Sequence, residues 1–175
     1  EDVIGEVPDR KSIPELDAAF LDLEKQIGLQ AVKDEMKELL ATAKENYERE
    51  KRSLKISTIP LNRVFLGNPG TGKTTIARIY GRIMKALNFL EKGDVVFKSA
   101  SDFVGSAVGE SENKTSSILQ RAEECVLVID EAYALDDGMY GKKVLDTLVE
   151  KVQGSGIAVV LIGYEKEIRD MLRNQ

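Results

Sequence analysis

The chain of 175 residues contains no histidine, no tryptophan and a single cysteine, Cys125. The lack of histidine excludes His-based acid–base catalysis and removes the commonest side-chain ligand of transition metals. One cysteine cannot form an internal disulfide or a cysteine-cluster zinc site, so Cys125 is expected to be a buried small residue leading into a strand. The chemistry must therefore use carboxylates, lysine, hydroxyls, main-chain amides or an added hard cation.

Long apolar runs and a basic balance are also lacking. No run approaches the roughly 20 apolar residues of a membrane-spanning helix, so no membrane partner is expected. The formal net charge is −5, and no basic patch is present, which argues against a nucleic-acid partner. The chain begins with Glu1 and shows no signal-peptide pattern, which fits a fragment or a processed chain and predicts an intracellular, cytoplasmic location.

The hydrophobic pattern predicts two N-terminal helices followed by alternating strands and helices. The first helix spans about Pro14 to Gln26 behind a capping box at Ser12, and Gly28 separates it from a second helix over about 30–54. Strands that alternate with helices favour a mainly parallel sheet with right-handed crossovers. The expected strands are 62–66, 95–98, 125–129 and 157–162, and the later helices are 74–87, 113–124, 144–152 and 165–172.

A glycine-rich segment follows the first expected strand. Residues 67–74 read Gly-Asn-Pro-Gly-Thr-Gly-Lys-Thr and match the Walker A pattern G-x-x-x-x-G-K-[S/T]. Its glycines let main-chain N–H groups point into one concavity, beside the positive end of the following helix. Lys73 would reach the β- and γ-phosphates of ATP, and the Thr74 hydroxyl would ligate Mg²⁺. The alternative interpretation is an ordinary glycine-rich turn before a helix. The predicted nucleotide-binding residues here are Asn68, Pro69, Gly70, Thr71, Gly72, Lys73, Thr74 and Thr75.

Two adjacent acids, Asp130 and Glu131, follow the apolar run 126–129 in the Walker B arrangement. Asp130 would hold Mg²⁺ through its water shell, and Glu131 would act as general base on the attacking water. Taken alone, such a pair is a polar turn, but the Walker A segment upstream favours the functional interpretation. The adjacent Glu131 favours a hydrolase over a phosphotransferase, which needs no water-activating carboxylate.

With these motifs the chain resembles the AAA+ ATPase family, and within it the subgroup of CbbX-type Rubisco activases and stage V sporulation protein K. The resemblance runs from about Ile27 to the C-terminus. The segments that carry it are 26–33, 65–78, 129–135, 145–149 and 162–164.

The resemblance implies an α/β P-loop NTPase fold with three α/β/α layers and strand order 5-1-4-3-2. A lead-in and helix over 1–28 would precede a core over 29–175, and Ile27 and Gly28 would lie against the adenine. ATP or ADP would lie between neighbours of a homo-oligomeric ring, usually a hexamer, or against other AAA+ domains. The family's fifth strand, arginine finger and helical lid would follow Gln175, so we expect an open edge on the first strand. For the same reason we expect nucleotide binding but slow hydrolysis unless a neighbouring subunit or a further segment contributes.

The resemblance also places residues 101–110 at the loop that faces the pore of the ring. Relatives that thread polypeptide carry an aromatic where this chain has Ala107, next to Val108. Phe103 is either a gripping side chain or part of the core. Tyr164, at the end of the fourth strand, is the candidate for the sensor residue.

Two functions remain open at this point. The first is an ATPase module, with Glu131 and Lys73 as catalytic residues and ATP and Mg²⁺ as cofactors, that remodels a protein partner of unknown identity. The alternative is a nucleotide-gated scaffold with little or no hydrolysis, which Ala107 and the arginine finger expected only after Gln175 motivate. Arg169 and Arg173 lie too early to be the arginine finger and are expected to be surface charges.

Overall fold

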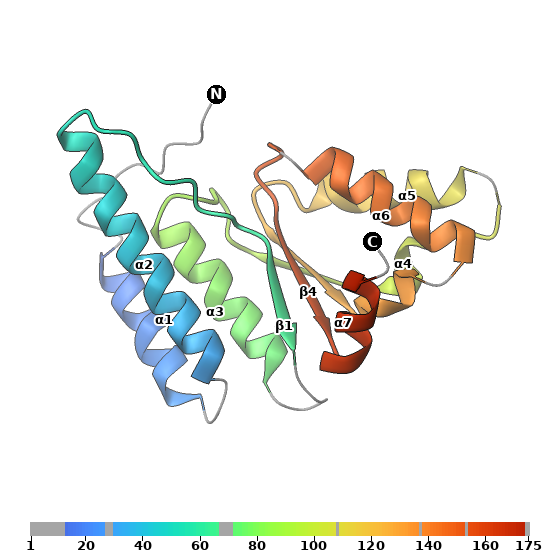
Figure 1. Ribbon diagram of the computed structural model, residues 1–175, viewed down its shortest axis with the longest axis horizontal. Helices are drawn as coiled ribbons and strands as arrows, with labels where there is room; N and C mark the ends of the chain where they lie inside the picture. Colours follow the sequence, from blue (N-terminus) through green and yellow to red (C-terminus); the bar gives the residue numbers. More distant parts are fainter. Residues whose placement is uncertain are drawn as a thin grey trace.

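Four parallel strands form the centre of the fold, with helices on both faces (Figure 1). This computed structural model describes residues 13–26, 30–66, 72–107, 109–136, 138–152 and 154–173. The strands lie in the order β1-β4-β3-β2. Their bounds are β1 Arg63–Leu66, β2 Val95–Ser99, β3 Val126–Asp130 and β4 Ala158–Gly163. The expected α/β class, the parallel sheet and the neighbour order 1-4-3-2 are confirmed.

Strand β1 is the outermost strand on one side of the described sheet. Within the described part of the chain, β1 pairs with β4 and lies at one edge of the sheet. Whether a fifth strand pairs with β1, as the family order 5-1-4-3-2 implies, stays a prediction.

The helices divide between the two faces of the sheet (Figure 1). One face carries α1 Ile13–Lys25, α2 Gln30–Lys51 and α3 Lys73–Ala86. The other carries α4 Ala100–Phe103, the 3-10 turn η1 Ala132–Asp136, α5 Glu110–Arg121, α6 Gly138–Val152 and α7 Glu165–Arg173. None of the described helices is long and apolar enough to cross a membrane.

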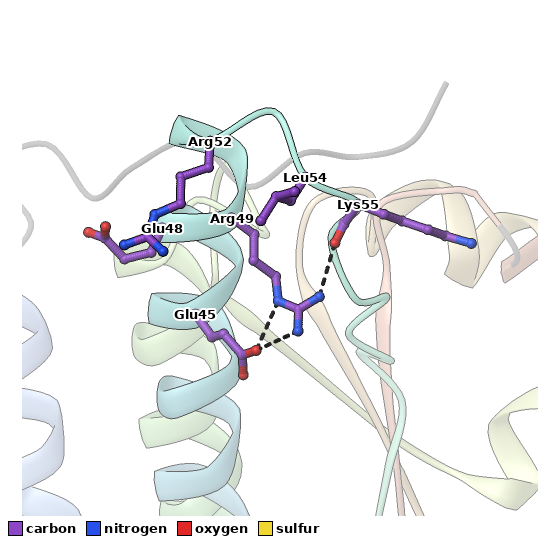
Figure 2. A pocket seen from close by; sticks show the side chains of 6 residues that line it. All are labelled: Glu45, Glu48, Arg49, Arg52, Leu54 and Lys55. Carbon is purple, nitrogen blue, oxygen red and sulfur yellow. Dashed lines mark hydrogen bonds and ion pairs between the residues drawn. The ribbon is translucent and has the colours of Figure 1, made fainter.

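The end of α2 is fastened by polar contacts, and the helix stops at Lys51, before the expected end near residue 54. Ser53 has a φ of +54°, which turns the chain out of the helix. Arg49 pairs with Glu45 at 2.8 Å and donates a hydrogen bond to the Lys55 carbonyl at 3.2 Å (Figure 2). A hollow of about 460 Å³ opens between these side chains and their neighbours. The residues that line the hollow belong to the C-terminal part of α2 and the segment that follows it.

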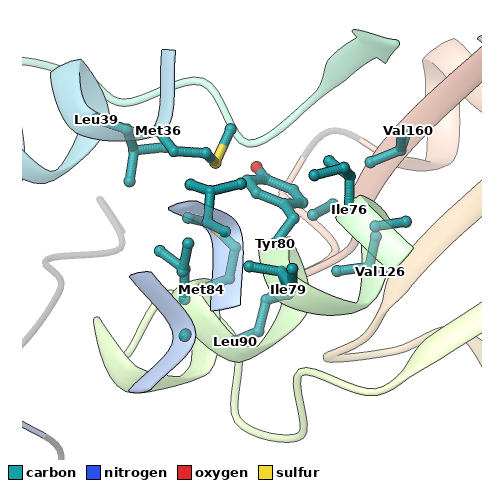
Figure 3. Close-up of a cluster of buried hydrophobic side chains, with 14 of the residues drawn as sticks. Met36, Leu39, Ile76, Ile79, Tyr80, Met84, Leu90, Val126 and Val160 are labelled. Carbon is teal, nitrogen blue, oxygen red and sulfur yellow. The ribbon is translucent and has the colours of Figure 1, made fainter. Parts of the chain in front are cut away.

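Strand side chains alternate between two apolar cores, one on each face of the sheet. Val126 and Val128 of β3 pack with α1, α2 and α3, whereas Leu127 and Ile129 pack with the helices of the other face. This is the alternation of a strand buried on both sides. The inward side of α3 is apolar and buried, and it includes Ile76, Ile79, Tyr80 and Met84 (Figure 3). Cys125 is buried as well.

The first helix is part of this packing. Leu16, Ala19 and Leu23 are buried in the same core as α3. Asp22 of α1 also pairs with Arg82 of α3 at 2.7 Å. The division of the chain at Gly28 stays a prediction, because residues 27–29 lie outside the described residues.

Candidate active site

The parallel sheet brings the predicted site segments to one edge. We call this the carboxyl edge and define it by the last residues of the strands: Leu66, Ser99, Asp130 and Gly163. Leu66 is in register with Gly163, and Ser99 with Asp130. Strand β4 thus lies between the end of β1, where the Walker A segment begins, and the end of β3, where the acid pair stands.

Gly72, within the Walker A segment, leads the chain into α3. Its φ is +83°, a backbone conformation that glycine adopts readily and that residues with a side chain disfavour. Its carbonyl accepts the hydrogen bond of the Ile76 amide at 2.9 Å, so it acts as the N-cap residue of the helix. A Cβ built on Gly72 would lie 3.8 Å from the Gln26 side chain, so the end of α1 lies beside this turn.

The first turn of α3 carries the charged and hydroxyl residues predicted for phosphate and Mg²⁺. Lys73 is half-buried, and Thr74 and Thr75 are exposed. A lysine and hydroxyls at the start of a helix suit an anionic ligand, since the helix dipole is positive there. Residues Asn68, Pro69, Gly70 and Thr71, and likewise Ile27 and Gly28, lie outside the described residues.

The acid pair stands where a buried strand reaches solvent. Residues 126–129 have no exposed surface, whereas Asp130 and Glu131 are exposed. The Glu131 amide donates a hydrogen bond to Asp130 Oδ1 at 2.9 Å, and Glu131 has a φ of +52°. Carboxylate and hydroxyl oxygens are the ligand atoms Mg²⁺ prefers, so Asp130 and Thr74 fit that ion. Within the described ranges, no group of three or more His, Cys, Asp or Glu side chains could hold a metal ion by itself.

Two tyrosines lie next to the acid pair. The rings of Tyr133, in η1, and Tyr164, directly after β4, have their centroids 6.1 Å apart. A Cβ on Gly163 would approach the Tyr133 ring to 3.2 Å and Ile168 to 2.8 Å, so glycine at the end of β4 makes room for both. Burial first, and then the charge of Glu131, raise the pKa of Tyr133.

The site residues predicted from the sequence do not include Tyr133, which lies in this neighbourhood. Its place two residues after Glu131 was the available signal. Tyr164, the candidate sensor, is 37% exposed at the carboxyl edge.

The predicted pore-facing segment is divided by the structure. Phe103 has no exposed surface and belongs to the core on the α5–α6 side, so its contacts favour the packing interpretation. Ala107 is exposed, and Val108 lies outside the described residues. Arg169 and Arg173 are exposed and pair within α7 with Glu165 and Asp170, as expected of surface charges.

Comparison with known proteins gives one family. The family model described as "ATPase family associated with various cellular activities (AAA)" matches residues 63–174, from β1 to α7. Stage V sporulation protein K of Bacillus subtilis is 35% identical over 151 residues, which are 83% of this chain and 47% of that protein.

Two further relatives carry the names of the expected subgroup. The chloroplastic ribulose bisphosphate carboxylase/oxygenase activase of Cyanidioschyzon merolae is 37% identical over 145 residues, 79% of this chain and 47% of that protein. Protein CbbX of Cereibacter sphaeroides is 34% identical over 154 residues, 85% of this chain and 50% of that protein. The resemblance to this subgroup is confirmed, and the chain spans about half the length of these relatives.

Proposed function

The chain belongs to the ATPase family associated with various cellular activities (AAA), and from this membership we propose that it is an ATP-binding and ATP-hydrolysing module of a ring-forming assembly that remodels a protein partner. One observation carries the proposal. The order β1-β4-β3 brings the start of α3 and the acid pair to the same carboxyl edge. A basic, hydroxyl-bearing helix start at the same edge as two exposed carboxylates suits a magnesium-bound triphosphate.

In the proposed site each side chain has one task. Lys73 and the main-chain N–H groups of 67–74 other than Pro69 would bind the phosphates. Thr74 and Asp130 would hold Mg²⁺, and the ion would neutralise charge on the phosphate oxygens. The Glu131 carboxylate removes a proton from the water that attacks the γ-phosphorus, and ADP and phosphate leave. Ile27 and Gly28 contact the adenine.

The remodelling part of the proposal is supported by the relatives. One of them is named as an activase of another protein, ribulose bisphosphate carboxylase/oxygenase. By analogy we propose that this chain works on a protein partner as a ring, usually a hexamer, with ATP between subunits. The loop around Ser106 and Ala107 would face that partner.

A nucleotide-gated scaffold is the second candidate function. Ala107 is small and Phe103 is buried, so the described part of this loop exposes no aromatic side chain that could grip a polypeptide. In such a scaffold ATP binding orders the assembly and turnover is slow. A nucleotide-dependent oligomer that releases no phosphate, with or without a polypeptide, would support the scaffold and contradict the remodelling ATPase.

The test of nucleotide binding is calorimetry with millimolar ATP and Mg²⁺. Lys73→Ala is compared with Lys85→Ala, a matched control at an exposed residue in the last turn of the same helix. Loss of a charge-assisted phosphate contact should weaken ATP binding at least about tenfold in Lys73→Ala. The control should bind as the unchanged protein does. Absence of binding heat in the unchanged protein, or equal affinities in both variants, would contradict the proposed site.

A further inference from the structure

The carboxylate of Glu110 is the centre of a hydrogen-bonded cluster between α4 and α5. Its Oε2 atom accepts hydrogen bonds from the Ser106 amide at 2.7 Å, the Ser106 hydroxyl at 3.1 Å and the Ala107 amide at 3.2 Å. Its Oε1 atom pairs with the Lys114 ammonium at 3.1 Å. One carboxylate thus ties two consecutive residues of the loop to the first turns of α5.

Two further side chains of α5 hold the preceding residues. Lys114 Nζ donates to the Val104 carbonyl at 3.1 Å, and the Gly105 amide donates to the hydroxyl of buried Ser111 at 2.9 Å. Each of the four residues 104–107 therefore has a main-chain polar group bonded to a side chain of α5. We call Glu110, Ser111 and Lys114 the clasp.

The approach between loop and helix is close. A Cβ added to Gly105 would lie 2.5 Å from the Glu110 Cβ, so only glycine lets the loop lie against the helix here. Phe103, buried in the core, anchors the other side of the loop. The loop is thus held at both ends.

The clasp differs from ordinary helix capping. The N-cap residue, Gly109, makes no side-chain capping bond. Glu110 is the first residue of α5. Its carboxylate accepts hydrogen bonds from main-chain amides of the preceding loop, at Ser106 and Ala107. The Ser106 amide and then Lys114 hold the pKa of Glu110 at about 2, so the carboxylate is ionised at physiological pH.

We propose that Glu110 and Lys114 are positioning residues that hold loop 104–107 in one conformation, with Ser106 and Ala107 as its contact surface for a polypeptide partner. Both contact side chains are exposed and small. Because the side chains of Ser106 and Ala107 are small and the loop is fixed, the main chain of a partner can approach it closely. Such a contact does not need a large side chain on the partner. That the partner is a polypeptide rests on the proposed function. That Glu110 and Lys114 fix the loop rests on the hydrogen bonds alone.

The first experiment measures amide hydrogen exchange of the full chain by NMR. Glu110→Ala removes three acceptor contacts, so exchange at Ser106 and Ala107 should become about tenfold or more faster. Glu110→Gln keeps an acceptor oxygen and should have a smaller effect. The matched control is Glu112→Gln, in the same turn of α5 but paired with Lys143. Unchanged exchange in Glu110→Ala, or equally fast exchange in the control, would overturn the clasp.

The second experiment tests whether Glu110 positions the loop for a polypeptide or only contributes to the stability of the fold. ATP turnover is measured against rising concentrations of reduced, carboxymethylated α-lactalbumin as an unfolded polypeptide probe. In Glu110→Ala the half-stimulating concentration should rise about tenfold with basal turnover unchanged, and Glu110→Gln should recover part of the loss. Equal half-stimulating concentrations in Glu110→Ala and the unchanged protein would overturn the positioning role. If the unchanged protein is not stimulated, the polypeptide contact fails together with the proposed function, and the exchange result alone then decides the clasp.

Discussion

Asp130 Oδ1 accepts a hydrogen bond from the main-chain N–H of Glu131 at 2.9 Å, and Glu131 itself has a φ of +52°. The bond fixes one oxygen of Asp130 and leaves the carboxylate exposed at the strand end. A positive φ in a residue with a side chain costs about 1 kcal/mol, and such strain concentrates at functional sites. The turn at Glu131 directs the chain out of β3 at the carboxyl edge. The two neighbouring acids therefore differ in backbone conformation, which suits the different roles proposed for them, Mg²⁺ binding by Asp130 and proton removal by Glu131.

Glu131→Gln should separate ATP binding from hydrolysis. The amide keeps the size of the side chain but cannot accept a proton from water, so phosphate release should fall about a hundredfold or more. ATP affinity should change little, because the proposed phosphate and Mg²⁺ contacts come from other residues. Calorimetry and a phosphate-release assay measure the two effects. Glu123→Gln, an exposed residue after α5, is the control, and unchanged turnover in Glu131→Gln would remove Glu131 from the mechanism.

Tyr164→Phe tests the candidate sensor. The substitution keeps the ring that lies 6.1 Å from Tyr133 and removes the hydroxyl, the polar group available at this end of β4. If that hydroxyl contacts the transferred phosphate or the water, kcat should fall about tenfold or more while ATP binding and the melting temperature stay the same. Tyr47→Phe on α2 is the matched control. Equal kcat in both variants would assign Tyr164 a packing role.

The sequence predicted the elements better than their ends. Helix α3 was placed within one residue at each end, because its apolar residues recur at helical spacing. Helix α5 begins at Glu110, before the expected residue 113, and α6 begins at 138, before the expected 144. Both predictions were wrong at the start because the first turn of each helix lacks the buried apolar residues that mark a periodic pattern.

Contacts between segments could not be predicted in the same way. Walker A and Walker B are local patterns, and the parallel order 1-4-3-2 places their flanking elements at one edge. The neighbourhood of Tyr133 and Tyr164 depends instead on the room left by Gly163. Likewise, Glu110 bonds backward to the loop only because Gly105 permits the approach. Neither the contact between the two tyrosines nor the bonding of Glu110 to the loop produces a recognisable spacing of residues in the sequence.

Gly81→Ala should destabilise the fold although it lies inside a helix. Glycine to alanine in a helix normally stabilises by about 1 kcal/mol. Here the added Cβ would meet the Gly93 carbonyl oxygen at 2.2 Å, so α3 would have to move away from the turn before β2. We expect a net loss of about 1–3 kcal/mol, measured by denaturant unfolding.

The control for this prediction is Gly154→Ala. Gly154 has a φ of +76° but no atom within 4 Å of an added Cβ, so it tests backbone strain alone. Its loss should be about 1 kcal/mol. A gain of stability in Gly81→Ala would show that the contact between α3 and Gly93 is looser than described.

Tyr80 should make stability depend on pH in the alkaline range. Its ring is buried in the α3 core, its hydroxyl donates to the Leu61 carbonyl, and burial raises its pKa to about 12. A tyrosine in the unfolded chain ionises near pH 10, so the folded state holds the proton more tightly. This contribution is full below pH 10 and is lost as the pH rises toward 12. Ionising the buried phenol lowers the free energy of unfolding by about 3 kcal/mol in all, relative to its value below pH 10.

Tyr80→Phe removes this dependence. The variant should lose about 1 kcal/mol at neutral pH, since the hydrogen bond to Leu61 is absent. Between pH 10 and 12 the free energy of unfolding should fall less steeply in Tyr80→Phe than in the unchanged protein or in Tyr47→Phe. Urea unfolding followed by circular dichroism measures the slope, and phenolate absorbance follows the ionisation. Parallel pH curves for Tyr80→Phe and the unchanged protein would mean that the Tyr80 hydroxyl ionises at the same pH in the folded and the unfolded chain.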